Sequence, residues 1–433
     1  ISLEKRTLSQ VTRKRTEIPK PRKRTFKTDR AAKDALAAAV AEKLADGFRD
    51  PAALPNPPAN AKTRELVLES AIRVDRDDQA AYAVYGDWLE AHGNPLGGVI
   101  AHALAGKAPT PKQLGKLGMP GEKLATATWR WGMWDVLRLE NDADWMDDTF
   151  DALALVRGAF AMVPCAALRE LRIGVLRWEH NWEDVPAVLA EAAKHAWAHD
   201  LQSLVLGDVS RDIDMAHHVI GVVGKAITAA FPKLRSLVLH SSEQTWRGKE
   251  AKTFGFAQLA LPELESLTIE TCSLSKQRVK ELLAAKLPKL TKLELWFGMK
   301  EYGANATLAD IAPILNATAF PQLTSLGLCN TEHACDLADA LPHGKLAPQL
   351  VRVDLSKGTL DDDAAETLAA NAAAFAKLEQ LDVSQSFLSP DAIARLGRAF
   401  GKRVAINADQ QRLDPDDDDE GRADEARYVA IYE

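Results

Sequence analysis

One pattern of apolar positions dominates the second half of the chain. The motif L-x-x-L-x-L, with Ile or Val at some places, occurs eight times in a single register. Its first residues are Leu168, Leu201, Leu234, Leu264, Leu290, Leu323, Leu350 and Leu378, and the spacings between them are 33, 33, 30, 26, 33, 27 and 28 residues. Eight matched occurrences predict a chain built from repeated units.

Each unit is predicted to be a strand followed by a helix. The last two apolar positions of the motif are two residues apart, so both side chains point to the same face of a short strand. After the last motif, Ser389 and Pro390 supply a helix-capping side chain and a proline at the first helical position, ahead of Ile393 and Leu396. Ser275 precedes a similar stretch. We expect each unit to cross back parallel to the one before it.

A single unit buries too few apolar side chains to fold alone, so stability requires stacking on its neighbours. Over residues 165–410 the pattern resembles leucine-rich repeats of the ribonuclease-inhibitor-like branch. The resemblance implies an α/β solenoid of about eight repeats, a horseshoe with strands on its concave side and helices outside.

The concave side is the predicted binding face. Residues between the buried strand positions should point there, and the sequence places on it Arg172, Val205, Val238, Thr268, Glu294, Gly327, Asp354 and Asp382, flanked by His240, Glu270, Trp296, Cys329, Ser356 and Ser384. The residues predicted to contact a partner are Arg172, His240, Glu270, Glu294, Trp296, Asp354 and Asp382. Trp296 is the expected anchor, because tryptophan often dominates interface energetics. The alternative is that Trp296 packs against Phe297 or a neighbouring repeat.

Residues 62–164 read as a small, mainly helical domain. They contain the run Tyr82-x-x-Tyr85-Gly86-Asp87-Trp88-Leu89-Glu90-Ala91-His92-Gly93-Asn94-Pro95. This run resembles the repeat-companion domain of bacterial proteins, which commonly precedes leucine-rich repeats. The stretch from Trp129 to Met133, leading into Val136–Leu139, resembles the strand that follows that domain.

A second resemblance lies upstream. Ile1-Ser2-Leu3, Arg24–Thr28 and Ala41–Phe48 resemble parts of the carboxy-terminal half of a WGR domain. Some WGR domains are associated with nucleic-acid binding. Thr12-Arg13-Lys14 stands where that family has its aromatic-Gly-Arg signature, so the chain departs from the family there.

The net charge of −7 hides two oppositely charged ends. Residues 1–30 hold 11 Lys/Arg against three acidic residues, and residues 412–433 hold nine acidic residues against three Arg. Such blocks resist collapse, so we expect a basic arm with the WGR-like segment at 1–50, a proline-rich linker at 51–61 and a solvated acidic tail at 411–433. The arm residues that are candidates for nucleic acid or an acidic protein are Arg13, Lys14, Arg15, Lys20, Arg22, Lys23 and Arg24.

Candidate catalytic and metal-binding patterns are weak. Glu191, His195 and His199 are spaced four apart, which on a helix would place them on one face. A closed zinc site needs further ligands that no spacing supplies, so we predict a solvated outer helix and no metal. No nucleophile elbow or assignable Ser/His/Asp set occurs. We therefore expect no enzyme activity and no cofactor.

Composition points to a cytoplasmic protein without a membrane segment. No run of 18 apolar residues occurs, and the first 30 residues contain no signal-peptide-like apolar stretch. The four cysteines form no C-x-x-C pair, which favours reduced thiols. The leading hypothesis is a non-catalytic adaptor or sensor that binds a protein. The alternatives are a nucleic-acid-associated protein acting through the basic arm, and a substrate or regulatory subunit of a larger bacterial system, such as a protease target.

Overall fold

The structure is a computed structural model, and its described parts fall into two compact units, residues 1–56 and 57–433. The described residues are 2–4, 7–10, 22–45, 63–117, 125–141, 151–177, 180–209, 218–243, 253–410 and 429–431. The predicted linker at 51–61 lies outside them, as does most of the predicted acidic tail.

The first unit is a small antiparallel sheet with one helix. Its strands β1 (Ser2–Glu4), β2 (Thr7–Gln10) and β3 (Arg22–Thr25) pair in that order. Helix α1 (Asp29–Ala45) follows, and Thr28 Oγ1 accepts a hydrogen bond from the Ala31 N–H at 3.2 Å just before it. Within the predicted basic arm, Arg22–Thr25 form a strand whose backbone pairs with β2.

The second unit begins with a group of short helices: α2 (Leu66–Val74), α3 (Gln79–Ala91), α4 (Leu96–Leu104) and α5 (Pro111–Gly115). Helices α3 and α4 approach each other closely because glycine stands at the contact. A Cβ added at Gly97 would lie 2.5 Å from the Gly86 carbonyl oxygen. Tyr82, Tyr85 and Leu89 of α3 are fully buried, so the signature run of the sequence forms the core of this helical part.

A β-hairpin joins the helices to the sheet. Strands β4 (Ala125–Arg130) and β5 (Met133–Leu139) are antiparallel. Trp131 and Gly132 connect them with φ values of 46° and 84°, the left-handed conformation of a tight hairpin turn.

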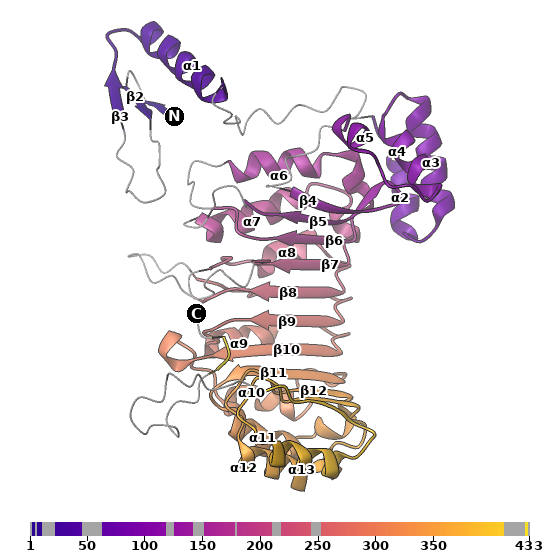
Figure 1. Cartoon of the computed structure of the whole chain (residues 1–433), viewed down its shortest axis with the longest axis vertical. Helices are drawn as coiled ribbons and strands as arrows, with labels where there is room; N and C mark the ends of the chain where they lie inside the picture. The colour runs from indigo at the N-terminus through magenta and orange to yellow at the C-terminus, as the bar shows by residue number, and fades with distance from the viewer. Residues whose placement is uncertain are drawn as a thin grey trace. The chain divides into compact units, whose positions relative to one another are not determined.

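The rest of the second unit is dominated by one long sheet (Figure 1). From β5 onward its strands are parallel and follow chain order. They are β6 (Glu170–Ile173), β7 (Ser203–Leu206), β8 (Ser236–His240), β9 (Ser266–Glu270), β10 (Lys292–Gly298), β11 (Ser325–Thr331), β12 (Arg352–Asp354), β13 (Gln380–Asp382) and β14 (Ala405–Asn407). Within the described residues the sheet has 11 strands and is open.

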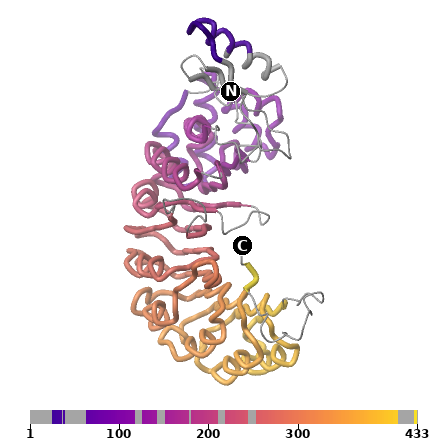
Figure 2. Tube along the Cα trace, turned by 90° about the vertical axis from the view of Figure 1, so that its left-hand side faces the viewer, coloured from indigo at the N-terminus to yellow at the C-terminus, as the bar shows by residue number. Residues whose placement is uncertain are grey.

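Helices between the strands form a second layer behind the sheet (Figures 1 and 2). They are α6 (Ala152–Phe160), α7 (Asn181–Ala192), α8 (Gly224–Ala230), α9 (Lys276–Ala284), α10 (Leu308–Leu315), α11 (Ala334–His343), α12 (Asp362–Ala370) and α13 (Pro390–Phe400). The predicted caps are present. Ser389 Oγ accepts from the Ala392 N–H at 3.2 Å, and Ser275 Oγ accepts from the Arg278 N–H at 3.3 Å.

The motif leucines form the shared interior between the sheet and the helices. One continuous row of paired positions crosses ten strands: Leu137, Leu171, Leu204, Leu237, Leu267, Leu293, Leu326, Val353, Leu381 and Ile406. The first leucine of each motif is at most 1% exposed. The predicted parallel stacking is therefore observed, as an α/β repeat architecture.

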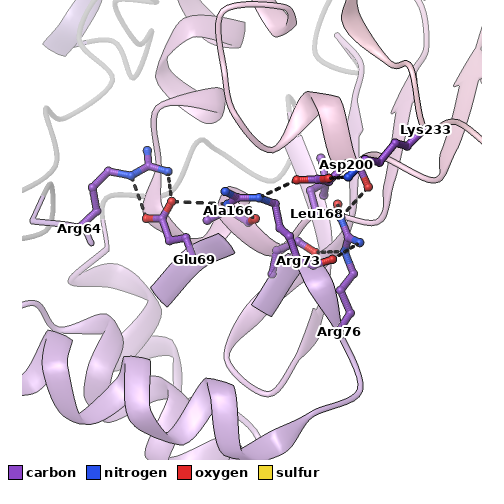
Figure 3. A network of polar contacts seen from close by, with 9 residues as sticks. Arg64, Glu69, Arg73, Arg76, Ala166, Leu168, Asp200 and Lys233 are labelled. Carbon is purple, nitrogen blue, oxygen red and sulfur yellow. Dashed lines mark hydrogen bonds and ion pairs between the residues drawn. The ribbon is translucent and has the colours of Figure 1, made fainter. Parts of the chain in front are cut away.

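A buried polar network ties the helical part to the sheet (Figure 3). Glu69 is fully buried and accepts hydrogen bonds from Arg64 Nε at 2.8 Å and Arg64 Nη2 at 2.6 Å. Arg73 reaches Asp200 Oδ2 from Nε at 3.0 Å, and Arg76 Nη2 donates to the Asp200 carbonyl oxygen at 2.7 Å. Helix α2 and the loop that leads out of it are thereby fixed to the turn before β7.

Asp200 is the junction of this network. Burial alone would raise the pKa of its carboxyl, but Lys233 and Arg73 outweigh that effect and the pKa is lowered. Lys233 Nζ donates to Asp200 Oδ1 at 2.7 Å. The carboxylate thus stays ionised where the two arginines of α2 and its following loop meet the repeats.

Candidate functional site

The face of the long sheet away from the helices is the candidate site, named here the open face. Among the described residues of the second unit, no helix lies on it. Its central row in register is Arg138, Arg172, Val205, Val238, Thr268, Glu294, Gly327, Asp354, Asp382 and Asn407. The structure places the sequence-predicted members of this row side by side. The sequence reasoning missed Arg138 and Asn407, whose strands lie outside the eight motifs.

The open face begins with a cluster of paired charges. Arg138 Nε contacts Asp208 Oδ2 at 2.6 Å, and Arg138 also pairs with Glu140. Arg172 pairs with Glu170, and its Nη1 lies 3.5 Å from Asp208 Oδ1. Burial would lower the pKa of Arg138, but its acidic partners raise it. The two cations are therefore neutralised within the chain, which disfavours a phosphate ligand here.

His240 and Glu270 lie next to each other across neighbouring strands. Their atoms Nδ1 and Oε2 are 2.9 Å apart. The ring of His218 lies 6.3 Å from that of His240, centroid to centroid. His218 is 1% exposed, and burial together with His240 lowers its pKa to about 3. His218 is thus neutral at physiological pH.

Among the described residues, neither histidine ring contacts a serine hydroxyl. The nearby Ser241 Oγ lies within hydrogen-bond distance of two backbone carbonyl oxygens, at 2.7 Å from Ser242 and 3.4 Å from His218. The imidazole Nε2 atoms of both His218 and His240 are buried without a hydrogen-bond partner among the described residues. The arrangement therefore lacks the nucleophile–base contact that covalent catalysis needs.

Trp296 lies within β10 and is half-buried. Its Nε1–H donates to Glu294 Oε1 at 3.0 Å, and Lys357 Nζ lies 5.3 Å from the ring centroid. Beside Tyr302, the indole packs against the buried side chain of Cys272. Trp296 is thus neither a fully exposed anchor nor a core residue: it forms one wall of a small apolar site.

That site is occupied by residues 429–431 of the same chain. Ile431 packs on the same cluster as Trp296, and Val429 is fully buried. Figure 2 shows this yellow segment on the side of the strands away from the helices. The prediction of a solvated acidic tail is wrong for residues 429–431. These three residues are uncharged, and Val429 and Ile431 bury apolar surface against the chain. The run Tyr428–Tyr432 was the signal in the sequence, but the neighbouring acids obscured it.

The acidic side chains late on the open face support local turns. Asp354 Oδ1 accepts from the Ser356 N–H at 3.1 Å. Asp382 Oδ1 accepts from the Ser384 N–H at 3.0 Å, and its Oδ2 accepts from Asn407 Nδ2 at 2.8 Å. These side-chain-to-backbone bonds close the turn after each strand. Both predicted partner-contacting acids therefore already have partners inside the chain.

The candidate metal spacing does not lie on one helix. Helix α7 ends at Ala192; His195 lies in the bend beyond it, and His199 in a separate short 3₁₀ helix, Ala198–Asp200. Glu191 pairs with Lys194 at 2.8 Å and Arg157 at 3.2 Å. Among the described residues no group of three His, Cys, Asp or Glu side chains is placed to hold a metal, and no helix there is long and apolar enough to cross a bilayer.

Most of the predicted basic-arm residues lie outside the described part of the chain. Arg13, Lys14, Arg15 and Lys20 lie outside the described residues. Arg22, Lys23 and Arg24 belong to β3, in the first unit. No geometry therefore relates these seven predicted residues to the open face.

Comparison with known proteins supports the fold. No family model and no curated protein sequence matches the chain. Among solved structures, the chain is similar to a Bacteroides fragilis protein determined by a structural genomics consortium, with a TM-score of 0.55 and 15% identity. The match covers 100% of this chain and 97% of that one. At this identity the likeness concerns the fold alone.

Proposed function

We propose that the chain is a leucine-rich-repeat protein with an N-terminal repeat-companion domain, and that it binds a protein partner on the open face. The motif leucines and their common register support the repeat type. The run from Tyr82 to Pro95 supports the companion domain, since it builds the core of the helical part directly before the sheet. The WGR-like segment stays a proposal from the sequence.

The observation that carries the binding proposal is the order of side chains along the central row. Half-buried Val205 and Val238, with Thr268 beside them, lie between the paired arginines on one side and Glu294 on the other. An apolar centre bordered by polar groups is the usual composition of a protein–protein interface. Because the arginines are already neutralised by acids, the face suits a mixed protein surface better than a polyanion.

Site-specific photo-crosslinking tests the proposal. A benzophenone amino acid at Val205 or Val238 should capture a protein of defined mass in living cells. Lys280, which is exposed on α9 in the helix layer, is the matched control position. Adducts from the two valine positions and none from Lys280 support the proposal. Equal adducts at all three positions, or none at the valines, contradict it.

A further inference from the structure

The segment Val429–Ile431 is held largely through its backbone. Asn330 Nδ2 donates to the Ile431 carbonyl oxygen at 2.7 Å, and the Ile431 N–H donates to Asn330 Oδ1 at 3.0 Å. The Ala430 N–H donates to the Lys357 carbonyl oxygen at 2.9 Å. Every peptide other than one with proline at these positions offers the same three groups, so these bonds are open to other segments.

Two left-handed residues in consecutive units create this polar edge. Asn330 and Lys357 have φ values of 52° and 67°. Their own N–H groups donate to the carbonyl oxygens of Ser356 and Ser384, at 3.0 and 2.9 Å. The backbone N–H groups of Asn330 and Lys357 are thus paired along the sheet. The side-chain amide of Asn330 and the backbone carbonyl of Lys357 bind the segment instead.

The side chains of the segment add selectivity. Val429 is fully buried, and Ile431 packs on Cys272 beside Trp296 and Tyr302. A charged side chain at the position of Ile431 would lose its hydration against these groups. Main-chain bonds with pockets for alternate side chains are a known way of binding peptides.

We infer that Cys272, Trp296, Tyr302, Asn330 and Lys357 form a peptide-binding site for a partner segment of the pattern aliphatic-x-aliphatic, and that residues 429–431 occupy it in the free chain. The inference rests on the proposed function, because it names the kind of segment that a protein partner would present where β10, β11 and β12 end.

The occupant competes with the partner from within the same molecule. Residues 411–428 connect it to Gln410, whose Nε2 donates to the Val383 carbonyl oxygen at 3.1 Å. A linked segment acts at a high effective concentration. If the site is open for about 1–10% of the time, the partner's apparent affinity falls by about 10- to 100-fold.

A fluorescence-anisotropy titration of the full chain tests this. The probe is a fluorescein-labelled peptide with the sequence of residues 425–433. The opened chain carries Val429→Asp and Ile431→Asp, two changes in the segment that leave the sheet untouched. It should bind the probe about 10- to 100-fold more tightly than wild type. A probe with the same two substitutions should bind the opened chain at least about tenfold more weakly than the unchanged probe.

Asn330→Asp in the opened chain removes the donor and turns a negative charge toward the peptide carbonyl. It should weaken probe binding at least about tenfold. Asn316→Asp, at the exposed end of α10, is the matched control and should change nothing. If Asn330→Asp does not fold, Trp296→Ala removes the apolar wall instead and should weaken the probe similarly.

The inference is overturned if the opened chain binds the probe no better than wild type, or if both probes bind equally. If photo-crosslinking at Val238 still captures a protein but the opened chain does not bind the probe, the proposed function stands and this inference fails. Probe binding to the opened chain without capture at Val238 would support the site and contradict the broader face.

Discussion

The hydroxyl of Tyr85 donates to the carboxylate of Glu69 at 2.7 Å, in a place from which water is excluded on both residues. Burial and the neighbouring carboxylate both raise the pKa of Tyr85, so the tyrosine remains a donor. With Arg64 and Arg73 also directed at Glu69, one buried carboxylate organises the contact between the helical part and the repeats.

Replacing Glu69 by Ala should lower the free energy of unfolding by about 3 kcal/mol, because it leaves buried donors unpaired. Urea unfolding followed by circular dichroism measures the change. The control is Glu366→Ala, which breaks the exposed pair with Arg395 and should cost no more than about 1 kcal/mol. Equal losses in the two variants would contradict the role given to Glu69.

Stability should also depend on pH through His218. Its folded pKa of about 3 lies below the unfolded value of about 6.5, so acid protonates the unfolded chain first. This contribution is complete above the unfolded pKa and is lost as pH falls toward the folded pKa. Between pH 7.5 and 5.5 it should lower the unfolding free energy by about 1.4 kcal/mol.

His218→Phe should remove that part of the pH dependence, because phenylalanine binds no proton, and the ring Nε2 has no partner to lose among the described residues. His343→Phe, an exposed position at the end of α11, should keep the wild-type profile. Urea titrations at the two pH values give the difference. An unchanged slope in His218→Phe would show that the folded and unfolded chains bind a proton at His218 equally, and would contradict the lowered pKa.

Ala317 offers a stabilising substitution. It follows α10 with φ 56°, and its N–H and that of Thr318 donate to Ile314 and Pro313 carbonyl oxygens, both at 3.0 Å. This is a helix-ending motif that favours glycine. Ala317→Gly should therefore raise the unfolding free energy by about 1 kcal/mol. Ala394 is exposed within α13, and Ala394→Gly, the control, should lower the unfolding free energy by about 1 kcal/mol. If both substitutions lower the unfolding free energy, Ala317 is not strained by its left-handed backbone.

The contact between Asn330 and Ile431 should be visible in hydrogen exchange. Asn330→Gly keeps the left-handed backbone accessible but removes two hydrogen bonds, worth about 1 kcal/mol each. Exchange of the Ala430 and Ile431 amides should then accelerate about 10- to 30-fold in mass-spectrometric measurements. Gln385→Gly, also left-handed with φ 49°, is the control and should leave these amides unchanged.

The sequence predicted the stacking of strands because the side-chain period of a strand is strict. Leu204 and Leu237 are 33 residues apart, yet they pair directly, since only that register buries both. The same register explains why His240 and Glu270 meet: both follow the last apolar position of their motif. Arg138 was missed because its strand, β5, precedes the first full motif.

Other features depend on contacts that no local pattern contains. The end of α7 at Ala192 has no glycine or proline to mark it, so the spacing of Glu191 and His195 suggested a longer helix. Composition describes residues 411–433 as acidic, and that average conceals the apolar Val429 and Ile431. Whether such residues bury depends on a distant acceptor, here Asn330.

The order of the strands has a consequence for synthesis. From β5 to β14, each strand pairs with the strand that precedes it in the sequence. During synthesis, the strand on which each new repeat packs has therefore already been made. Residues 429–431 instead return to β11, a strand completed much earlier. During synthesis there is therefore an interval in which the residues of the peptide site have been made but residues 429–431 have not.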